Sequence, residues 1–184
     1  MRLSIYPDGG VARLRVHGEG LLAPRFADLP LDLAALENGG RITACSNMFY
    51  SSPNNLLLPG PARTMGEGWE TSRRRDSGND WVQVHLANRG VLTAAELDTS
   101  YFIGNSPGSA RLSGRDRDGE WFELLPRTEL QPDTRHRFLI GDHRPVTEAR
   151  LDIHPDGGMA RLRLFGKLTP DGLRQVNERW ERSA

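Results

Sequence analysis

Residues 150–166 read RLDIHPDGGMARLRLFG, and residues 2–18 read RLSIYPDGGVARLRVHG. Twelve of these seventeen positions are identical, at a constant offset of 148 residues. In the later copy, Leu151 and Ile153 alternate with polar residues before the turn sequence Pro155–Gly158, and apolar residues alternate with arginines after it. A period of two is typical of a half-buried β-strand, and proline with two glycines favours a tight turn. Each copy therefore predicts an antiparallel hairpin with one apolar face and one arginine-bearing face.

The rest of the chain is predicted to provide the larger sheet that such a hairpin needs, because a lone hairpin is at best marginally stable in water. Apolar and polar residues alternate in short stretches, separated by turn sequences rich in glycine, asparagine and aspartate. Several short antiparallel strands with this spacing are typical of an all-β sandwich or jelly roll. The expected strands are residues 41–46, 81–86, 91–99, 110–113, 121–125 and 137–140.

The C-terminal residues follow a different pattern. Thr169 is a good helix cap, Pro170 suits a first helical turn, and Leu173, Val176 and Trp180 form one apolar stripe. A short docking helix is therefore expected here.

Together with the repeat, the sequence predicts a closing hairpin of a preceding and mostly absent repeat (residues 1–20), a linker (21–36), one jelly-roll domain (37–168) and the helix (169–184).

The composition excludes several classes of protein. Lys and Arg together number 24 and balance 24 Asp and Glu, so no positive excess favours nucleic acid or an anionic membrane as a partner. The longest apolar runs, such as residues 56–58, are too short to cross a bilayer. Cys45 is the only cysteine, so an internal disulfide is impossible and a reducing cytoplasm is the expected location. The histidines show no ligand-like spacing, so no cofactor is evident, although a divalent metal stays open.

Two long stretches, residues 47–80 and 100–109, are predicted to be loops, where binding and catalytic residues tend to lie. The first contains Arg73, Arg74 and Arg75 in a row. An arginine side chain can bind a carboxylate through two parallel hydrogen bonds, so one or two of them could face an anionic small molecule. The alternative is a solvated turn with local ion pairs.

Polar residues of both loops add candidates for chemistry. Asp98 ends the strand before the second loop and Asn105 lies within that loop, which places both near the expected edge of a sheet. Asp98 could act as a general base or only as a turn-capping acceptor. In the first loop, Asn54 and Asn55 offer amide donors and acceptors. The residues alone thus predict an antiparallel β domain with arginines and carboxylates on its loops.

A set of motifs follows in order along residues 31–167: NLLLPG (55–60), MGEGWETSRRR (65–75), NDWVQVHL (79–86), ELDTSYFIGN (96–105), LLPRTELQPDTRHRF (124–138) and the copy at 150–166. Together they resemble the allantoicase family, the ureide hydrolases of purine breakdown. The resemblance implies two tandem jelly rolls of the galactose-binding-like type, and hydrolysis of allantoate to ureidoglycolate and urea. The chain is similar to the second repeat with the closing hairpin of the first.

The resemblance also implies roles for individual residues. Allantoate carries one carboxylate and two ureido groups on one carbon, and the loss of urea needs a proton donor for the departing nitrogen and a base for water. A homo-oligomer that binds this small molecule, and neither nucleic acid nor a membrane, is expected. Arg73, Arg74 or Arg75 would hold the carboxylate, Glu70, Asp80 and Asp98 would be the acid and base candidates, and Asn55 and Asn105 would bind the ureido groups.

Departures from the family's pattern keep an alternative open. That pattern has acidic residues where this chain has Asn47, Met48 and Asn54, and histidines where it has Asn79 and Tyr101. The chain could therefore be a noncatalytic allantoicase-like sandwich that acts as a binding or structural subunit. A small-sugar-binding module is a third hypothesis, which rests on fold analogy alone.

Overall fold

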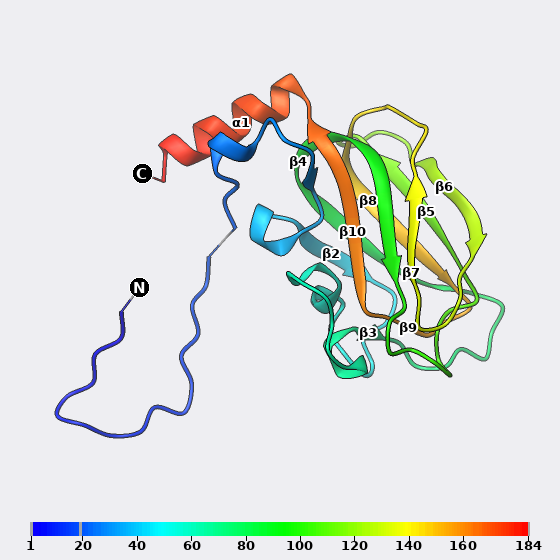
Figure 1. The fold of residues 1–184 in the computed structure, drawn as a ribbon, viewed down its shortest axis with the longest axis horizontal. Helices are drawn as coiled ribbons and strands as arrows, with labels where there is room; N and C mark the ends of the chain where they lie inside the picture. Colours follow the sequence, from blue (N-terminus) through cyan, green and yellow to red (C-terminus); the bar gives the residue numbers. More distant parts are fainter. Residues whose placement is uncertain (1, 19, 184) are drawn as a thin grey trace.

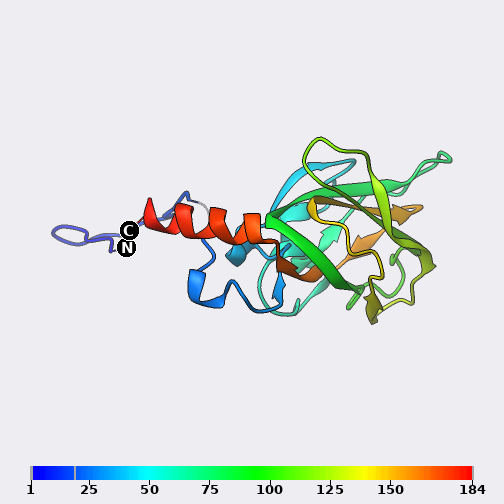
Figure 2. The ribbon, with the colours of Figure 1, turned by 90° about the horizontal axis from the view of Figure 1, so that it is seen from above.

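The computed structural model describes residues 2–18 and 20–183. Residues 20–183 form a β-sandwich with one helix at its side, and residues 2–18 extend away from the sandwich (Figures 1 and 2). The predicted segments 1–20 and 169–184 include residues 1, 19 and 184, which lie outside the described residues.

The central strand, β4 (Asp80–Asp98), runs through both layers of the sandwich. Its first half pairs antiparallel with β2 (Arg41–Cys45) and β8 (Val146–His154), whereas its second half pairs antiparallel with β7 (Arg135–Leu139) and β10 (Arg161–Leu168). The pairing changes partners in the middle of β4, where the register shifts. One strand therefore ties the two layers together.

Shorter strands complete the two layers. β5 (Ser109–Arg115) pairs with β8 and with β6 (Phe122–Glu129), and β1 (Leu31–Asp32) pairs with β10. A separate two-stranded sheet joins β3 (Trp69–Glu70) to β9 (Gly158–Met159). The predicted all-β antiparallel sandwich is thus confirmed. Short 3-10 helices lie in the connections of the described chain, at Pro24–Phe26, Leu36–Asn38, Pro53–Leu57 and Met65–Glu67.

The core lies between the two layers, because each strand turns alternate side chains inward. Val82 and Val84 from the first half of β4, Leu97 from its second half, and Leu151 and Leu162 from the neighbouring strands are completely buried. The alternation in the sequence therefore marks the face of each strand that turns toward the core.

Helix α1 (Pro170–Glu181) begins where the sequence predicts. The Oγ1 atom of Thr169 accepts a hydrogen bond from the amide of Gly172 at 3.1 Å, and Pro170 occupies the first turn. Val176 is buried against the sandwich. The predicted short C-terminal helix and its cap are confirmed. Among the described residues, no helix is both long and apolar enough to cross a membrane.

The two copies of the repeated sequence differ from the predicted hairpins. Residues 2–18, which we call the arm, contain no strand, and each of these residues is exposed. In residues 150–166, which we call the closing segment, β8 and β10 pair with opposite halves of β4 and not with each other. The closing segment therefore crosses from one layer to the other. Alternation of apolar and polar residues shows only which face of a strand is buried, and the strands of both layers turn their buried faces to the same core. The pattern is therefore the same whether two successive strands pair as a hairpin or lie in different layers.

Candidate functional site

A cleft of about 480 Å³ opens where three loop segments meet. Its walls come from residues 70–71, 73–74, 104–106 and 155–157, together with Tyr50. Clefts of this size that hold a few convergent polar groups are the usual sites for small ligands. The motifs at 65–75 and 96–105 both reach this cleft.

The turn of the closing segment fixes the strand that carries Glu70. In the small sheet, Glu70 lies opposite Gly158. The next residue, Thr71, donates its amide to the carbonyl oxygen of Gly157 at 3.1 Å, and its Oγ1 accepts the amide of Gly157, also at 3.1 Å. Gly157 has a φ of 128°, a conformation that glycine adopts without strain. The Pro-Asp-Gly-Gly turn is therefore one wall of the cleft and a support for its neighbour.

Glu70 and Asn105 meet inside the cleft. The Nδ2 atom of Asn105 donates a hydrogen bond to Oε1 of Glu70 at 2.6 Å, and the Oγ atom of Ser51 accepts the backbone amide of Glu70 at 2.7 Å. Within the described residues, no donor reaches the second carboxylate oxygen, Oε2. Glu70 is thus held in place by one oxygen while the other is free for a ligand.

The three consecutive arginines have different surroundings. The guanidinium of Arg74 binds both oxygens of Asp76 at 2.9 and 3.0 Å and Oδ1 of Asp80 at 3.2 Å. Its hydrogen bond with Asp76 raises the pKa of Arg74 above the ordinary value. Arg73 also lines the cleft, but its guanidinium is exposed and forms no ion pair with any residue that the structure describes. Arg75 is exposed and does not line the cleft. Arg73 is therefore the cation available to an anionic ligand.

Asp80 lies behind Arg74 rather than in the cleft. Its side chain is completely buried, and its Oδ1 accepts hydrogen bonds from Ser46 Oγ at 2.8 Å and from Arg74. Its Oδ2 is buried without a hydrogen-bond partner among the described residues. A buried carboxylate is stable only when it is well paired. The ion pair therefore stabilises the buried charge of Asp80 and at the same time orients the guanidinium of Arg74.

Besides Asp80 and Arg75, two more predicted site residues lie outside the cleft. Asp98 lines a different cleft of about 310 Å³ beside β10, where its Oδ1 accepts the amide of Ser100 at 2.8 Å and its Oδ2 lies 3.6 Å from Arg135. The side-chain amide of Asn55 donates a hydrogen bond to the carbonyl oxygen of Gly68 at 2.9 Å, which links two parts of the loop at 47–80. The second half of β4 carries Asp98 into the other layer, which separates it from Glu70. Its turn-capping role, the alternative reading of the sequence, is the one observed.

Sequence reasoning missed Asp156. Its Oδ2 accepts a hydrogen bond from the backbone amide of Arg74 at 2.8 Å, and the residue lines the cleft. The signal was present in the sequence, because an identical Pro-Asp-Gly-Gly occurs in the arm at residues 7–10. The sequence pattern predicts only a role in the turn for this aspartate. Nowhere among the described residues, the cleft included, do three His, Cys, Asp or Glu side chains lie together as a group that could hold a metal ion.

Comparisons with known proteins show which family the chain resembles. A family model described as the allantoicase repeat matches residues 31–169. The chain is 63% identical over 170 residues to a probable allantoicase of Nocardia farcinica, covering 91% of this chain and 52% of that protein. It is 51% identical over 182 residues to a probable allantoicase of Streptomyces coelicolor, covering 97% of this chain and 48% of that protein. The chain thus spans about half the length of the curated relatives it matches.

Solved structures show the same architecture. The crystal structure of allantoicase from Saccharomyces cerevisiae matches with a TM-score of 0.73 at 32% identity, over 80% of this chain and 45% of that one. An F5/8 type C domain from Bacteroides fragilis matches with a TM-score of 0.58 at 20% identity, over 76% of this chain and 97% of that one. The second likeness concerns the fold alone.

Proposed function

Because the chain belongs to the allantoicase family, we propose that its cleft binds allantoate and hydrolyses it to ureidoglycolate and urea. In this reaction the bond between the central carbon and one ureido nitrogen breaks. That nitrogen takes up a proton and leaves as urea, while the oxygen of water bonds to the carbon and gives up a proton. One proton is donated and one is accepted, so a single carboxyl group can serve in turn as acid and base.

Arg73 binds the carboxylate of allantoate in this proposal. The observation that carries the proposal is the position of this unpaired guanidinium in the same cleft as Glu70 and Asn105. An arginine without a protein partner can give both of its parallel N–H groups to a carboxylate. Arg74 keeps a supporting role, because Asp76 and Asp80 already occupy its guanidinium.

Glu70 is the proposed acid and base. Its Oε2 faces no donor among the described residues, and Asn105 fixes the direction of the carboxyl group through Oε1. A protonated Glu70 would give its proton to the departing ureido nitrogen, and the resulting carboxylate would take the proton of the attacking water. The side-chain oxygen of Asn105 can accept a ureido N–H, which would align that group.

The wider organisation belongs to the proposal as well. We keep the division into a linker at 21–36, whose β1 pairs with β10 of the sandwich, a jelly-roll domain at 37–168 and a helix at 169–184. A cytoplasmic location fits the single cysteine, and a homo-oligomer remains the expected assembly. Asp80 enters the proposal as the support of Arg74, whereas Asp98 and Asn55 have no part in the chemistry.

Urea release from allantoate by the purified chain tests this function. We expect release by the unmodified chain and a fall in kcat of at least about a hundredfold for Glu70→Gln, the usual worth of a general acid–base group. Glu67→Gln is the matched control, since Glu67 lies in the same motif and binds Arg63 outside the cleft. Absence of urea, also with added divalent metal, would contradict the catalytic proposal. Allantoate binding without urea release would then favour the noncatalytic alternative.

A further inference from the structure

The aspartate of the Pro-Asp-Gly-Gly turn has one carboxylate oxygen that the protein itself does not use. Oδ2 of Asp156 accepts the backbone amide of Arg74 at 2.8 Å. Oδ1 accepts no hydrogen bond and forms no ion pair with any residue that the structure describes. The guanidinium of Arg74 binds Asp76 and Asp80 instead. The cleft therefore contains a second carboxylate, besides that of Glu70, with an oxygen left for a ligand.

The backbone that follows Asp156 is fixed in place by the other walls of the cleft. Gly157 exchanges two hydrogen bonds with Thr71, each of 3.1 Å. The amide of Gly158 donates to the carbonyl oxygen of Asn105 at 2.8 Å. A group that is already held in its binding position loses little conformational freedom when a ligand arrives. The carboxylate of Asp156 is therefore preorganised, by its own backbone and by the hydrogen bond to Oδ2.

A second carboxylate is unfavourable in a cleft for an anion unless the ligand also donates hydrogen bonds. The two negative charges repel each other, and a half-buried carboxylate oxygen without a donor loses part of its hydration. Allantoate carries one negative charge, but each of its two ureido groups has N–H donors on both nitrogens. Two such N–H groups can lie parallel and bind one carboxylate, as the two N–H groups of an arginine do. The unused oxygen of Asp156 therefore fits a ureido group and does not fit a carboxylate.

From these contacts we infer that Asp156 binds the ureido group that stays on the central carbon of allantoate, an inference that rests on the proposed function and deepens it. The three polar substituents of allantoate then have separate partners in the cleft. Arg73 binds the carboxylate, Glu70 and Asn105 serve the departing ureido group, and Asp156 holds the retained one. Asp156 is thus a specificity residue, which distinguishes allantoate from a carboxylate that has only one ureido group.

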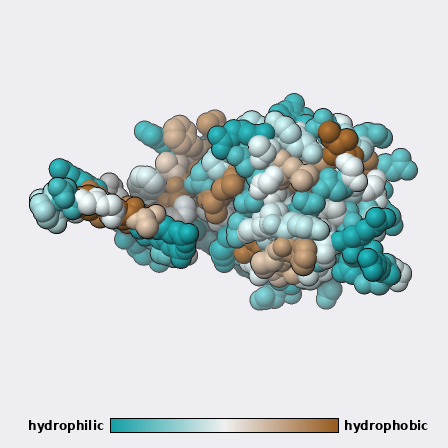
Figure 3. Space-filling model, turned by 90° about the horizontal axis from the view of Figure 1, so that it is seen from below, coloured by the Kyte–Doolittle hydropathy of each residue, from teal (hydrophilic) through white to brown (hydrophobic). Residues whose placement is uncertain are grey.

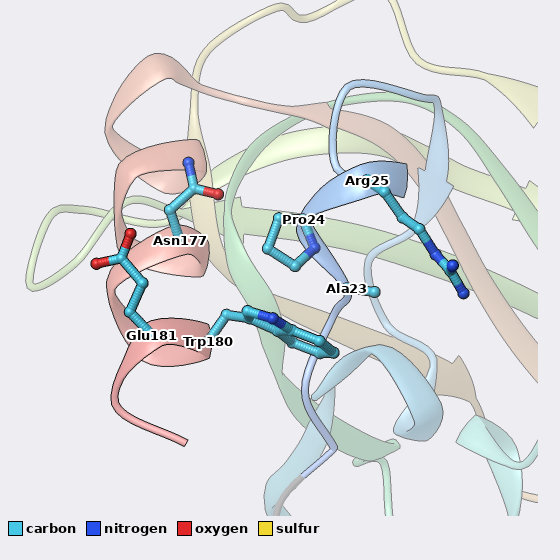
Figure 4. Close-up of a pocket in the computed structure, with 6 residues that line it drawn as sticks. All are labelled: Ala23, Pro24, Arg25, Asn177, Trp180 and Glu181. Atoms are coloured by element: carbon cyan, nitrogen blue, oxygen red, sulfur yellow. The ribbon is translucent and has the colours of Figure 1, made fainter. Parts of the chain in front are cut away.

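A groove of about 540 Å³ between α1 and residues 23–25 does not offer the same set of groups. Figure 4 shows the ring of Trp180 beside Pro24, whereas the charged ends of Arg25 and Glu181 point away from each other. Apolar side chains gather in this region, where the arm joins the sandwich (Figure 3). A ligand with one carboxylate and two ureido groups needs several convergent polar partners, so the cleft fits it and the groove does not.

Calorimetric titration with two ligands tests the inference: allantoate, and ureidoacetate, a carboxylate with one ureido group. We expect the unmodified chain to bind allantoate at least about tenfold more tightly than ureidoacetate, the usual worth of a hydrogen bond to a charged group. In Asp156→Asn the two ligands should bind with affinities that agree to within about threefold. The side-chain oxygen of asparagine can still accept the amide of Arg74, so this variant keeps the turn and loses only the carboxylate.

The ratio of the two affinities separates this role from a purely structural one. If Asp156 only held the backbone of Arg74, Asp156→Asn would weaken both ligands together and the preference for allantoate would be unchanged, which would overturn the inference. Asp8→Asn makes the same change in the arm, and Trp180→Ala changes the groove beside α1. Both are controls that should keep the ratio of the unmodified chain.

Two further measurements keep the inference open to refutation. Asp156→Ser, whose hydroxyl oxygen can also accept the amide of Arg74, replaces the asparagine variant if that variant does not fold, and the same loss of preference is expected. Equal affinity of the unmodified chain for the two ligands would overturn the inference without any variant. Failure of the proposed hydrolysis is distinguishable, because a preference that Asp156→Asn removes would support the inference even if no urea is released. Urea release with an unchanged preference in Asp156→Asn would support the hydrolysis and overturn the inference.

Discussion

Gly158 is the position where a single methyl group should have the largest effect. A Cβ atom there would lie 1.9 Å from Cε1 and 2.1 Å from Cδ1 of Phe102, whose ring is completely buried. Carbon atoms in contact are about 3.5–4.0 Å apart, so the ring or β9 must move by about 1.6 Å or more. Overpacking of this kind costs about 1–3 kcal/mol, and the depth of this clash places Gly158→Ala near 3 kcal/mol.

The same substitution also has a stabilising effect, which is smaller than the cost of overpacking. Replacing glycine by alanine reduces the entropy of the unfolded chain, which stabilises a protein by about 0.4–1 kcal/mol. The net loss is therefore about 2 kcal/mol or more. For a chain of this length 1 kcal/mol corresponds to about 2–4 °C, so the unfolding midpoint of Gly158→Ala should fall by about 4–8 °C.

Thermal unfolding followed by circular dichroism measures this difference. Gly10→Ala is the matched control from the other copy, where nothing lies within 4 Å, and its midpoint should stay within about 1 °C of the unmodified chain. Because β9 pairs with β3, Gly158→Ala should also lower urea release from allantoate. A midpoint for Gly158→Ala within about 1 °C of the control would refute the packing argument.

Three further predictions follow from the contacts. Arg161→Met removes a hydrogen-bond donor from three main-chain carbonyl groups, and among the described residues only the carbonyl of Gly60 keeps another side-chain donor, Arg163. The free energy of unfolding should therefore fall by about 3 kcal/mol in urea titrations, and an unchanged value would contradict the role of Arg161 in holding these carbonyl groups. The hydrogen bonds from Arg89 hold the pKa of Asp116 below its ordinary value of 3.8, so the ionised carboxylate stabilises the fold above that pH. Asp116→Asn should therefore cost about 1 kcal/mol at neutral pH, and the difference should shrink as the pH falls below 3.8; a difference independent of pH would exclude this pair as its source. Deleting residues 2–18 should leave the unfolding midpoint unchanged, because these residues are exposed, and a clear fall would show that the arm packs on its own sandwich.

The sequence predicted the fold well where a feature depends only on residues close together in the chain. Thr169 and Pro170 mark the start of α1 because capping depends on neighbouring residues only. Alternation likewise located β5 and β8, but it predicted two strands, at 81–86 and 91–99, where the structure has the single strand β4. The partners of a strand depend on residues far away in the chain, so the crossing of the closing segment between layers was not predictable from its own pattern.

In the candidate site, too, the sequence indicates which residues are candidates but not which of them lie close together. The sequence places Glu70 and Asn105 in two separate loop motifs as candidates, and the structure brings both side chains into one cleft. The sequence could not separate Arg73 from Arg74, because the difference lies in the partners that occupy Arg74. It also grouped Asp98 with them, since only the passage of β4 into the second layer removes that residue from the cleft.

The binding of allantoate to the purified chain tests the central claim most directly. Calorimetric titration of Arg73→Ala should show a dissociation constant at least about tenfold higher than that of the unmodified chain, since hydrogen bonds to a charged group contribute about 1.5–3 kcal/mol. Arg75→Ala, the neighbouring arginine outside the cleft, should bind as the unmodified chain does. Equal affinity of Arg73→Ala and the unmodified chain, or no binding of allantoate by the unmodified chain, would contradict the account.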